Sequence, residues 1–119
     1  MARQAPSLDA YGPGGFRVSG LWRPGSLLIL QDEPRDWRPH SLSDLAAEDF
    51  AEVLAAGAEA SDFVLLGTGA EQGLPPPAVR AVLREASLGL EFMSTPNAAR
   101  TWSVLREQGR RVALAMLAL

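Results

Sequence analysis

The sequence predicts an α/β protein of three layers, in which a central mixed, mostly parallel sheet is flanked by helices and a small extra β-meander lies in the N-terminal part. Two observations predict this class. In the second half of the chain, short apolar runs alternate with amphipathic segments in the order strand, helix, strand, helix, strand. In the first third, short apolar segments are separated by glycine and proline turns. The length of 119 residues predicts a single domain over residues 1–119.

The N-terminal third is expected to form short strands rather than helices. Phe16 and Val18 alternate with polar residues, so they should share the buried face of one strand. The polar, proline-rich stretch 32–39 is expected to be a loop. The expected strands lie at residues 8–11, 16–18, 21–22 and 27–30, with turns at 12–15 and 24–25.

The remaining elements alternate between helices and buried strands. Ser43 is expected to cap the first helix, which Gly57 ends, and Thr95 is expected to cap the last helix with Pro96 at its first position. The second helix should run from Pro75 to Ala86. The expected strands are 63–67, 89–94 and 110–117. The first has no alternation and should be covered on both faces, and the last is again nearly all apolar.

The composition excludes several kinds of chemistry. The chain has no cysteine and no lysine and only one histidine, His40, which excludes disulfides, thiolate nucleophiles, zinc ribbons, P-loop lysines and Schiff-base lysines. A formal net charge of −3 gives no indication of nucleic-acid binding. His40 is expected to be exposed or structural, and Asp32, Glu33 and Asp36 are read as ordinary loop charges. No catalytic residue, metal or cofactor is therefore predicted, and an enzyme is the least favoured class.

The hydrophobic runs are too short for a membrane span. The longest has eight residues, VALAMLAL, whereas a spanning helix needs about 20. The first residues, MARQAPSLD, lack the apolar core of a signal peptide. We therefore expect a cytoplasmic protein, with a position at the periphery of the inner membrane as the open alternative.

A candidate ligand site follows from the expected parallel strands. If strands 63–67 and 89–94 run in parallel, their carboxyl ends lie at one edge, where open α/β sheets bind ligands. The glycine loop after the first strand and the helix start after the second then offer N–H groups and a helix dipole to a small anion or nucleotide. The alternative is that the glycines serve backbone geometry and that Thr95 is only a cap. The candidate residues are Gly67, Thr68, Gly69, Thr95, Asn97 and Arg100.

Aromatic residues mark a candidate surface for a protein partner. Trp102 falls at a core position of its helix, but Trp22 and Trp37 flank a loop and are expected in an exposed patch together with Tyr11. Exposed tryptophan and tyrosine residues commonly anchor protein partners. Association with a second copy of the chain is left open.

Several stretches together resemble one known family. They are AYGPGGFRVSG, FVLLGTG, LPPPAVRAVLRE, STPNAARTWSVL and EQGRRVALAML, and they extend in this order from about Leu8 to Leu117. The set is similar to the family of the mitochondrial respiratory complex I assembly factor 3, which includes bacterial and archaeal proteins of unknown function. The resemblance implies a three-layer α/β fold with a mixed sheet, in which one strand can run antiparallel, and an extra small sheet.

The resemblance also implies a function. The mitochondrial member helps to assemble complex I with other assembly factors at the membrane, and no catalytic activity is established for the family. Many relatives carry an aspartate where this chain has Ser94, so acid–base chemistry at that position would be lost here. The leading hypothesis is a non-enzymatic interaction protein that assists assembly of respiratory complex I or another membrane complex, with respiratory subunits or assembly factors as partners. The alternative is the anion- or nucleotide-binding module.

Overall fold

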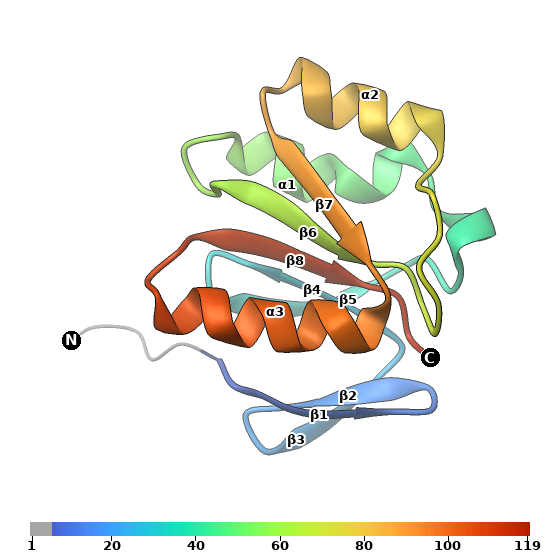
Figure 1. Cartoon of the computed structure of the whole chain (residues 1–119), viewed down its shortest axis with the longest axis vertical. Helices are drawn as coiled ribbons and strands as arrows, with labels where there is room; N and C mark the ends of the chain where they lie inside the picture. The colour runs from blue at the N-terminus through green and yellow to red at the C-terminus, as the bar shows by residue number, and fades with distance from the viewer. Residues whose placement is uncertain (1–5) are drawn as a thin grey trace.

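The computed structural model describes residues 6–119, and its middle layer is a five-stranded mixed sheet (Figure 1). The strands are β4 (Ser26–Leu30), β5 (Glu33–Trp37), β6 (Phe63–Gly67), β7 (Gly89–Met93) and β8 (Val112–Met116). Their order in space is β5-β4-β8-β6-β7. β6 pairs in parallel with β7 and β8, whereas β4 pairs antiparallel with β5 and β8, so β4 alone runs against the other strands. The predicted mixed, mostly parallel sheet is confirmed.

Helices cover both faces of this sheet. α1 (Ala51–Ala56) and α2 (Pro77–Glu85) lie on one face, where Phe50, Val64 and Leu83 belong to one core. α3 (Thr95–Glu107) lies on the other face, where Trp102 and Leu114 belong to a second core. Residues 1–5, which the predicted single domain includes, lie outside the described part. Within residues 6–119, every helix is too short or too polar to cross a membrane.

A separate antiparallel sheet lies beside α3 (Figure 1). It consists of β1 (Leu8–Gly12), β2 (Gly15–Val18) and β3 (Leu21–Pro24) in sequential order. The predicted inward residues Phe16 and Val18 are 0% and 3% exposed and pack against the same core as Trp102. The predicted N-terminal meander is thus confirmed, and its last expected strand, at 27–30, enters the central sheet as β4.

The predicted loop at 32–39 is wrong over most of its length. Residues 33–37 form β5, an edge strand that pairs with β4 along its whole length. Pro34 breaks the pattern that is typical of a central strand, but an edge strand tolerates proline because one side of its backbone needs no ladder hydrogen bonds. Trp37 ends this strand and is 7% exposed, with its ring against the edge of Phe50 at a centroid distance of 5.5 Å. It therefore belongs to the core and not to the predicted exposed patch.

The first helix also begins later than predicted. Two short 3-10 turns, Leu42–Asp44 and Ala47–Phe50, precede α1. Ser43 lies within the first of these turns, and its side chain does not cap a helix. The side chain that accepts a backbone N–H before α1 is instead Asp49, whose carboxylate accepts the Ala46 N–H at 2.8 Å. Gly57 ends α1 with a φ of 76°, as the sequence predicts.

One arginine holds this irregular segment together. The Arg38 guanidinium donates to both oxygens of Asp49 at 2.6 Å and to Asp44 at 3.0 Å. The His40 N–H also donates to Asp44, and Trp37 Nε1–H donates to the Asp49 carbonyl. The hydrogen bonds from Arg38 lower the pKa of Asp49, and those from His40 N–H and Arg38 lower the pKa of Asp44. His40 is exposed and contributes its backbone to this network, which gives it a structural role.

We expect these carboxylates to make the protein sensitive to acid. Both pKa values are lower in the folded chain, so the native state binds fewer protons than the unfolded chain, and the stabilisation is lost as the pH falls. The free energy of unfolding should decrease between about pH 5 and pH 2, and urea titrations across this range measure it. Asp49→Asn should lower stability at neutral pH and flatten the pH dependence. Equal slopes for wild type and Asp49→Asn would contradict the assignment.

Candidate functional site

The glycine loop after β6 and the beginning of α3 lie against each other at one edge of the sheet, as the sequence predicts. The Thr68 N–H donates to the Met93 carbonyl at 2.8 Å, at the end of the neighbouring strand β7. The Thr95 N–H donates to the Gly69 carbonyl at 2.7 Å, and the Gly69 N–H donates back to Thr95 Oγ1 at 2.9 Å. The two segments are therefore joined directly by hydrogen bonds.

Thr95 is the centre of this junction. It is fully buried, and its Oγ1 accepts from Gly69 and donates to the Leu117 carbonyl at 2.8 Å. The predicted capping role is wrong, because the cap of α3 is Ser94, whose Oγ accepts the Asn97 N–H at 3.4 Å. Thr95 instead connects the loop after β6, the helix start and the segment after β8.

Thr68 closes the other side of the loop. Its side chain is nearly buried, and Oγ1 lies within donating distance of the Glu71 carbonyl at 2.7 Å and the Met93 carbonyl at 3.1 Å. The same oxygen accepts the Gly73 N–H at 3.1 Å. Thr68 thus holds the loop 68–73 in a fixed turn over the end of β7.

The N–H groups that an anion would need at this edge are donated within the chain. Those of Thr68, Gly69, Thr95 and Asn97 all have partners. Gly67 is packed so closely that a Cβ there would lie 2.9 Å from Thr95 Oγ1. The geometry supports the structural alternative for the glycines, and ligand binding by Gly67, Thr68, Gly69 and Thr95 stays a prediction.

Asn97 and Arg100 lie outside this junction, on the exposed side of α3. The Arg100 guanidinium donates to Asn97 Oδ1 and to the Tyr11 hydroxyl, the latter at 3.3 Å. Arg100 thereby links α3 to β1, and between these two elements lies a groove of about 420 Å³ that Tyr11 and Val104 help to line. One predicted ligand residue and one predicted partner residue are thus brought together, although the sequence assigned them to different sites.

Trp22 remains exposed, as predicted, on the outer side of the small sheet. It is opposite Arg17 in the pairing of β2 with β3, and it is 47% exposed. Its ring lies over Gly12 and Gly15, since a Cβ at Gly15 would come within 2.8 Å of the ring. The neighbouring Leu21 is 73% exposed. Of the predicted patch, Tyr11 and Trp22 lie on the surface and Trp37 does not.

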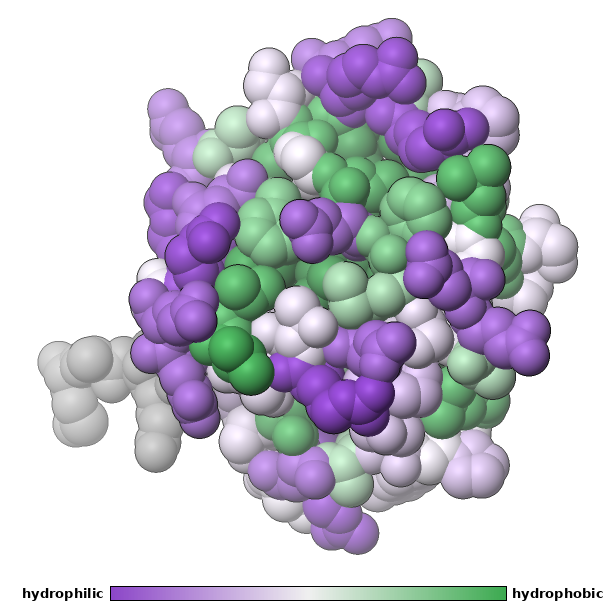
Figure 2. Space-filling view, viewed as in Figure 1, coloured by the Kyte–Doolittle hydropathy of each residue, from purple (hydrophilic) through white to green (hydrophobic). Residues whose placement is uncertain are grey.

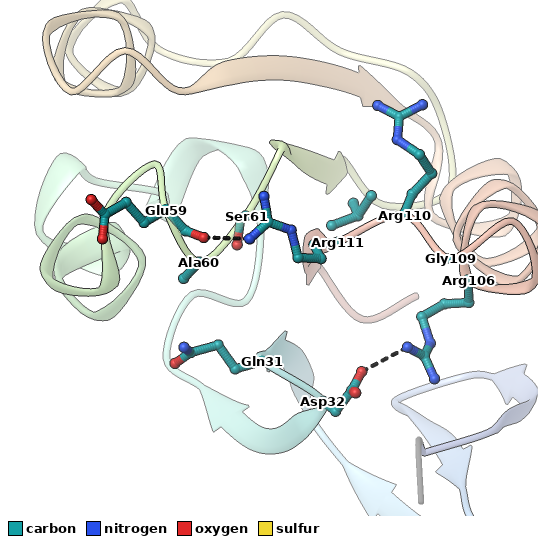
Figure 3. Close-up of a pocket in the computed structure, with 10 residues that line it drawn as sticks. Gln31, Asp32, Glu59, Ala60, Ser61, Arg106, Gly109, Arg110 and Arg111 are labelled. Atoms are coloured by element: carbon teal, nitrogen blue, oxygen red, sulfur yellow. Dashed lines mark hydrogen bonds and ion pairs between the residues drawn. The ribbon is translucent and has the colours of Figure 1, made fainter. Parts of the chain in front are cut away.

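The opposite edge of the sheet contains a cavity of about 470 Å³ that the sequence analysis missed (Figure 3). Its walls come from the turn after β4, the segment before β6 and the segment between α3 and β8. The three arginines close together in the sequence, Arg106, Arg110 and Arg111, could have indicated a basic surface here. The sequence did not indicate that the segments 31–32 and 59–61 form the other walls of the cavity. The lining residues are Gln31, Asp32, Glu59, Ala60, Ser61, Arg106, Gly109, Arg110, Arg111 and Val112.

The three loop carboxylates that were considered as possible metal ligands each form an ion pair with a different arginine. Asp32 pairs with Arg106 at 2.8 Å, and Asp36 pairs with Arg23 at 3.0 Å. Glu33 lies 3.4 Å from Arg35. In the part of the chain that the structure describes, no three acidic or histidine side chains converge on a metal position.

Comparison with known proteins gives several matches over nearly the whole chain. The model of a family described as "Protein of unknown function (DUF498/DUF598)" matches residues 8–117. An uncharacterised protein of Rhodobacter capsulatus is 38% identical over 92% of this chain and 82% of its own length. A Bordetella parapertussis protein of known crystal structure is 28% identical, with a TM-score of 0.87 over 100% of both chains.

A further match carries a functional name. The mouse protein named NADH dehydrogenase (ubiquinone) 1 alpha subcomplex assembly factor 3 is 27% identical over 96% of this chain. The chain spans 61% of the length of that mouse protein. These matches confirm the resemblance to the family of complex I assembly factor 3 and the fold expected from it. Because the family model covers residues 8–117, the chain belongs to the DUF498/DUF598 family of proteins of unknown function.

Proposed function

We propose that this protein is a non-catalytic factor that assists the assembly of a respiratory membrane complex of the complex I type. The observation that carries the proposal is the match to a relative named as a complex I assembly factor, which extends over 96% of this chain. The part that the two proteins share is therefore the fold described above. An assembly factor acts by binding other proteins, and we propose that it does so at the periphery of the inner membrane.

We propose the outer side of the β1–β3 sheet as the surface that binds the partner. Trp22 packs over Gly12 and Gly15 on this side of the sheet and is 47% exposed. Large apolar side chains held on a rigid strand lose little conformational entropy on binding, which favours them as anchors. Figure 2 also shows hydrophobic residues that interrupt the charged surface over α3, next to this sheet. Tyr11, tied to Arg100, lies at the boundary between the sheet and α3.

We expect Trp22→Ala to weaken partner binding by about 30-fold or more, the loss typical of a central interface residue. The protein is tagged in a native bacterium, and the recovery of respiratory complex subunits is compared between wild type and variant. The NADH:quinone activity of a deletion strain complemented by each form is measured in parallel. Trp22→Ala should melt close to the wild type, because the side chain is already 47% exposed.

The control is Leu74→Ser, which removes another exposed apolar side chain, 63% exposed, from the loop before α2. It should leave both recovery and activity unchanged. The proposed surface is wrong if Leu74→Ser and Trp22→Ala behave alike. The assembly role itself is wrong if the deletion strain has normal NADH:quinone activity and the tagged wild type recovers no respiratory subunit.

A further inference from the structure

β7 is an edge strand whose outer side is open. Among the described strands it pairs with β6 alone, at the end of the five-stranded sheet. The Met93 carbonyl points toward β6, since it accepts the Thr68 N–H at 2.8 Å. Backbone groups alternate in direction along a strand, so those of Leu90 and Phe92 point away from β6. Their N–H and C=O groups are therefore available to a further strand.

β7 lacks the features that protect the other sheet edges from strand pairing. Within residues 6–119, the open edges are those of β1, β3, β5 and β7. β1 has a register shift between Leu8 and Ala10, and β3 and β5 contain Pro24 and Pro34. Bulges and prolines are typical of edges that do not accept another strand. β7 has neither, and its residues 89–93 pair with β6 in unbroken register.

A groove of about 300 Å³ lies along this edge, between β7 and α2. Its apolar part includes Leu90 and Phe92, which are half-buried and pack against the core under α2. Figure 2 shows hydrophobic residues at the surface around β7. An added strand would remove this apolar surface from water, which favours its binding. The lining residues are Arg80, Arg84, Leu88, Gly89, Leu90 and Phe92.

The α2 side of the groove is positively charged. Arg80 and Arg84 are one helical turn apart, and both line the groove. Within residues 6–119, neither guanidinium forms an ion pair or a hydrogen bond with another residue. Arginine side chains pair well with carboxylates, which accept their N–H groups in a fixed geometry. Acidic side chains on an added strand would therefore complement this side.

The other face of β7 carries the opposite charge. Glu91 is exposed and shares its face with Met93, which belongs to the core under α3. Two copies of the chain that paired antiparallel through the centre of β7 would place their Glu91 carboxylates opposite each other. Like charges in that position destabilise a strand pair. The charges thus disfavour a second copy and favour a strand from another protein.

We propose that the open edge of β7 binds an extended segment of a partner protein as an added strand. Carboxylate side chains of that segment face Arg80 and Arg84, and an uncharged or basic residue faces Glu91. Main-chain hydrogen bonds to Leu90 and Phe92 supply affinity, and the charges select the sequence. The edge lies at the end of the molecule away from the β1–β3 sheet (Figure 1), and the proposal does not rest on the assembly role.

The first arm of the test selects ligands for the whole protein from a phage library of short random peptides. We expect the selected peptides to carry acidic residues at alternate positions, and a synthetic copy of one is titrated by fluorescence anisotropy. The double variant Arg80→Gln, Arg84→Gln should weaken binding by about tenfold, since each partly exposed ion pair contributes about threefold. The matched control Arg80→Lys, Arg84→Lys keeps both charges and should retain most of the affinity. Melting curves establish that each variant is folded.

The second arm locates the peptide by amide hydrogen exchange. The amides of Leu90 and Phe92 should exchange quickly in the free protein and become protected by the peptide. The Glu91 amide, which is directed toward β6, should be protected in both states. N-methylation of one alternate set of the peptide's amides should abolish binding, because it removes the donors of the new ladder, whereas methylation of the other set should not.

Three results would overturn the proposal. In the first, the selected peptides have no acidic preference, or the glutamine double variant binds them as tightly as the wild type does. In the second, the bound peptide leaves the amides of Leu90 and Phe92 unprotected. In the third, the free protein sediments as a dimer in which these two amides are already protected, because a second copy then occupies the edge.

Discussion

Thr95→Val should destabilise the protein by roughly 3 kcal/mol, since it leaves two buried polar groups without a partner and each costs about 1–3 kcal/mol. Valine has nearly the same shape as threonine, so the loss comes from the hydroxyl and not from a cavity. The Gly69 N–H and the Leu117 carbonyl would both be left unpaired. Urea titration measures the effect, and the melting temperature should fall by about 10 °C.

Two variants control for this result. Thr95→Ser keeps an oxygen at the same position and should recover most of the lost stability. Thr101→Val removes a half-buried hydroxyl of the same helix, whose one hydrogen-bond partner among the described residues is the sulfur of Met93, at 3.5 Å. It should cost less than about 1 kcal/mol. If Thr95→Val and Thr101→Val have equal effects, Thr95 does not have the linking role assigned to it.

Gly67→Ala is expected to cost about 2–3 kcal/mol, a typical penalty for adding a methyl group to a closely packed core. The new Cβ would lie 2.9 Å from Thr95 Oγ1, 3.0 Å from Thr95 Cα and 3.1 Å from Met116 Cγ. Backbone atoms are among these neighbours, so the chain itself has to move and the hydrogen bonds of Thr95 are distorted with it. The free energy of unfolding and the amide exchange of Gly69 should both report this change.

The matched control is Gly12→Ala, also at a strand glycine. A Cβ there would meet only the Trp22 ring, at an ordinary contact distance of 3.6 Å. The change should stay within about 0.5 kcal/mol. A Gly67→Ala protein as stable as Gly12→Ala would show that the loop after β6 adapts easily, and the structural reading of its glycine would then be wrong.

The sequence predicts most elements of this fold because their patterns are strong. The apolar run at 63–67 coincides with β6, and the expected second helix, Pro75 to Ala86, contains α2. The last helix begins at Thr95, one residue before its predicted first position, Pro96. β5 is missed because Pro34 and its charged neighbours are typical of a loop, and only the pairing with β4 makes them a strand. The start of α1 is missed because Arg38 and Asp49, which are eleven positions apart, impose the two 3-10 turns.

The candidate site is predicted less completely, because several of its contacts join residues that lie far apart in the sequence. Parallel strands bring the loop after β6 to the start of α3, and the sequence pattern predicts this contact. It does not predict that Thr95 reaches Leu117, which decides that Ser94 is the cap instead. The arginine-lined cavity joins residues 31–32, 59–61 and 106–112, and only the order of strands in the sheet brings these segments together.

The central position of β8 also bears on how the chain is made. β8 lies between β4 and β6, and it pairs with β4 on one side and with β6 on the other. During synthesis, the β4–β5 hairpin and the β6–β7 unit leave the ribosome earlier, and each exposes an apolar strand edge that residues 112–116 must later fill. A nascent chain in this state is prone to aggregate or to bind a chaperone. Completion of the sheet therefore waits for release of the last strand from the exit tunnel, and native structure should form only after translation has passed it.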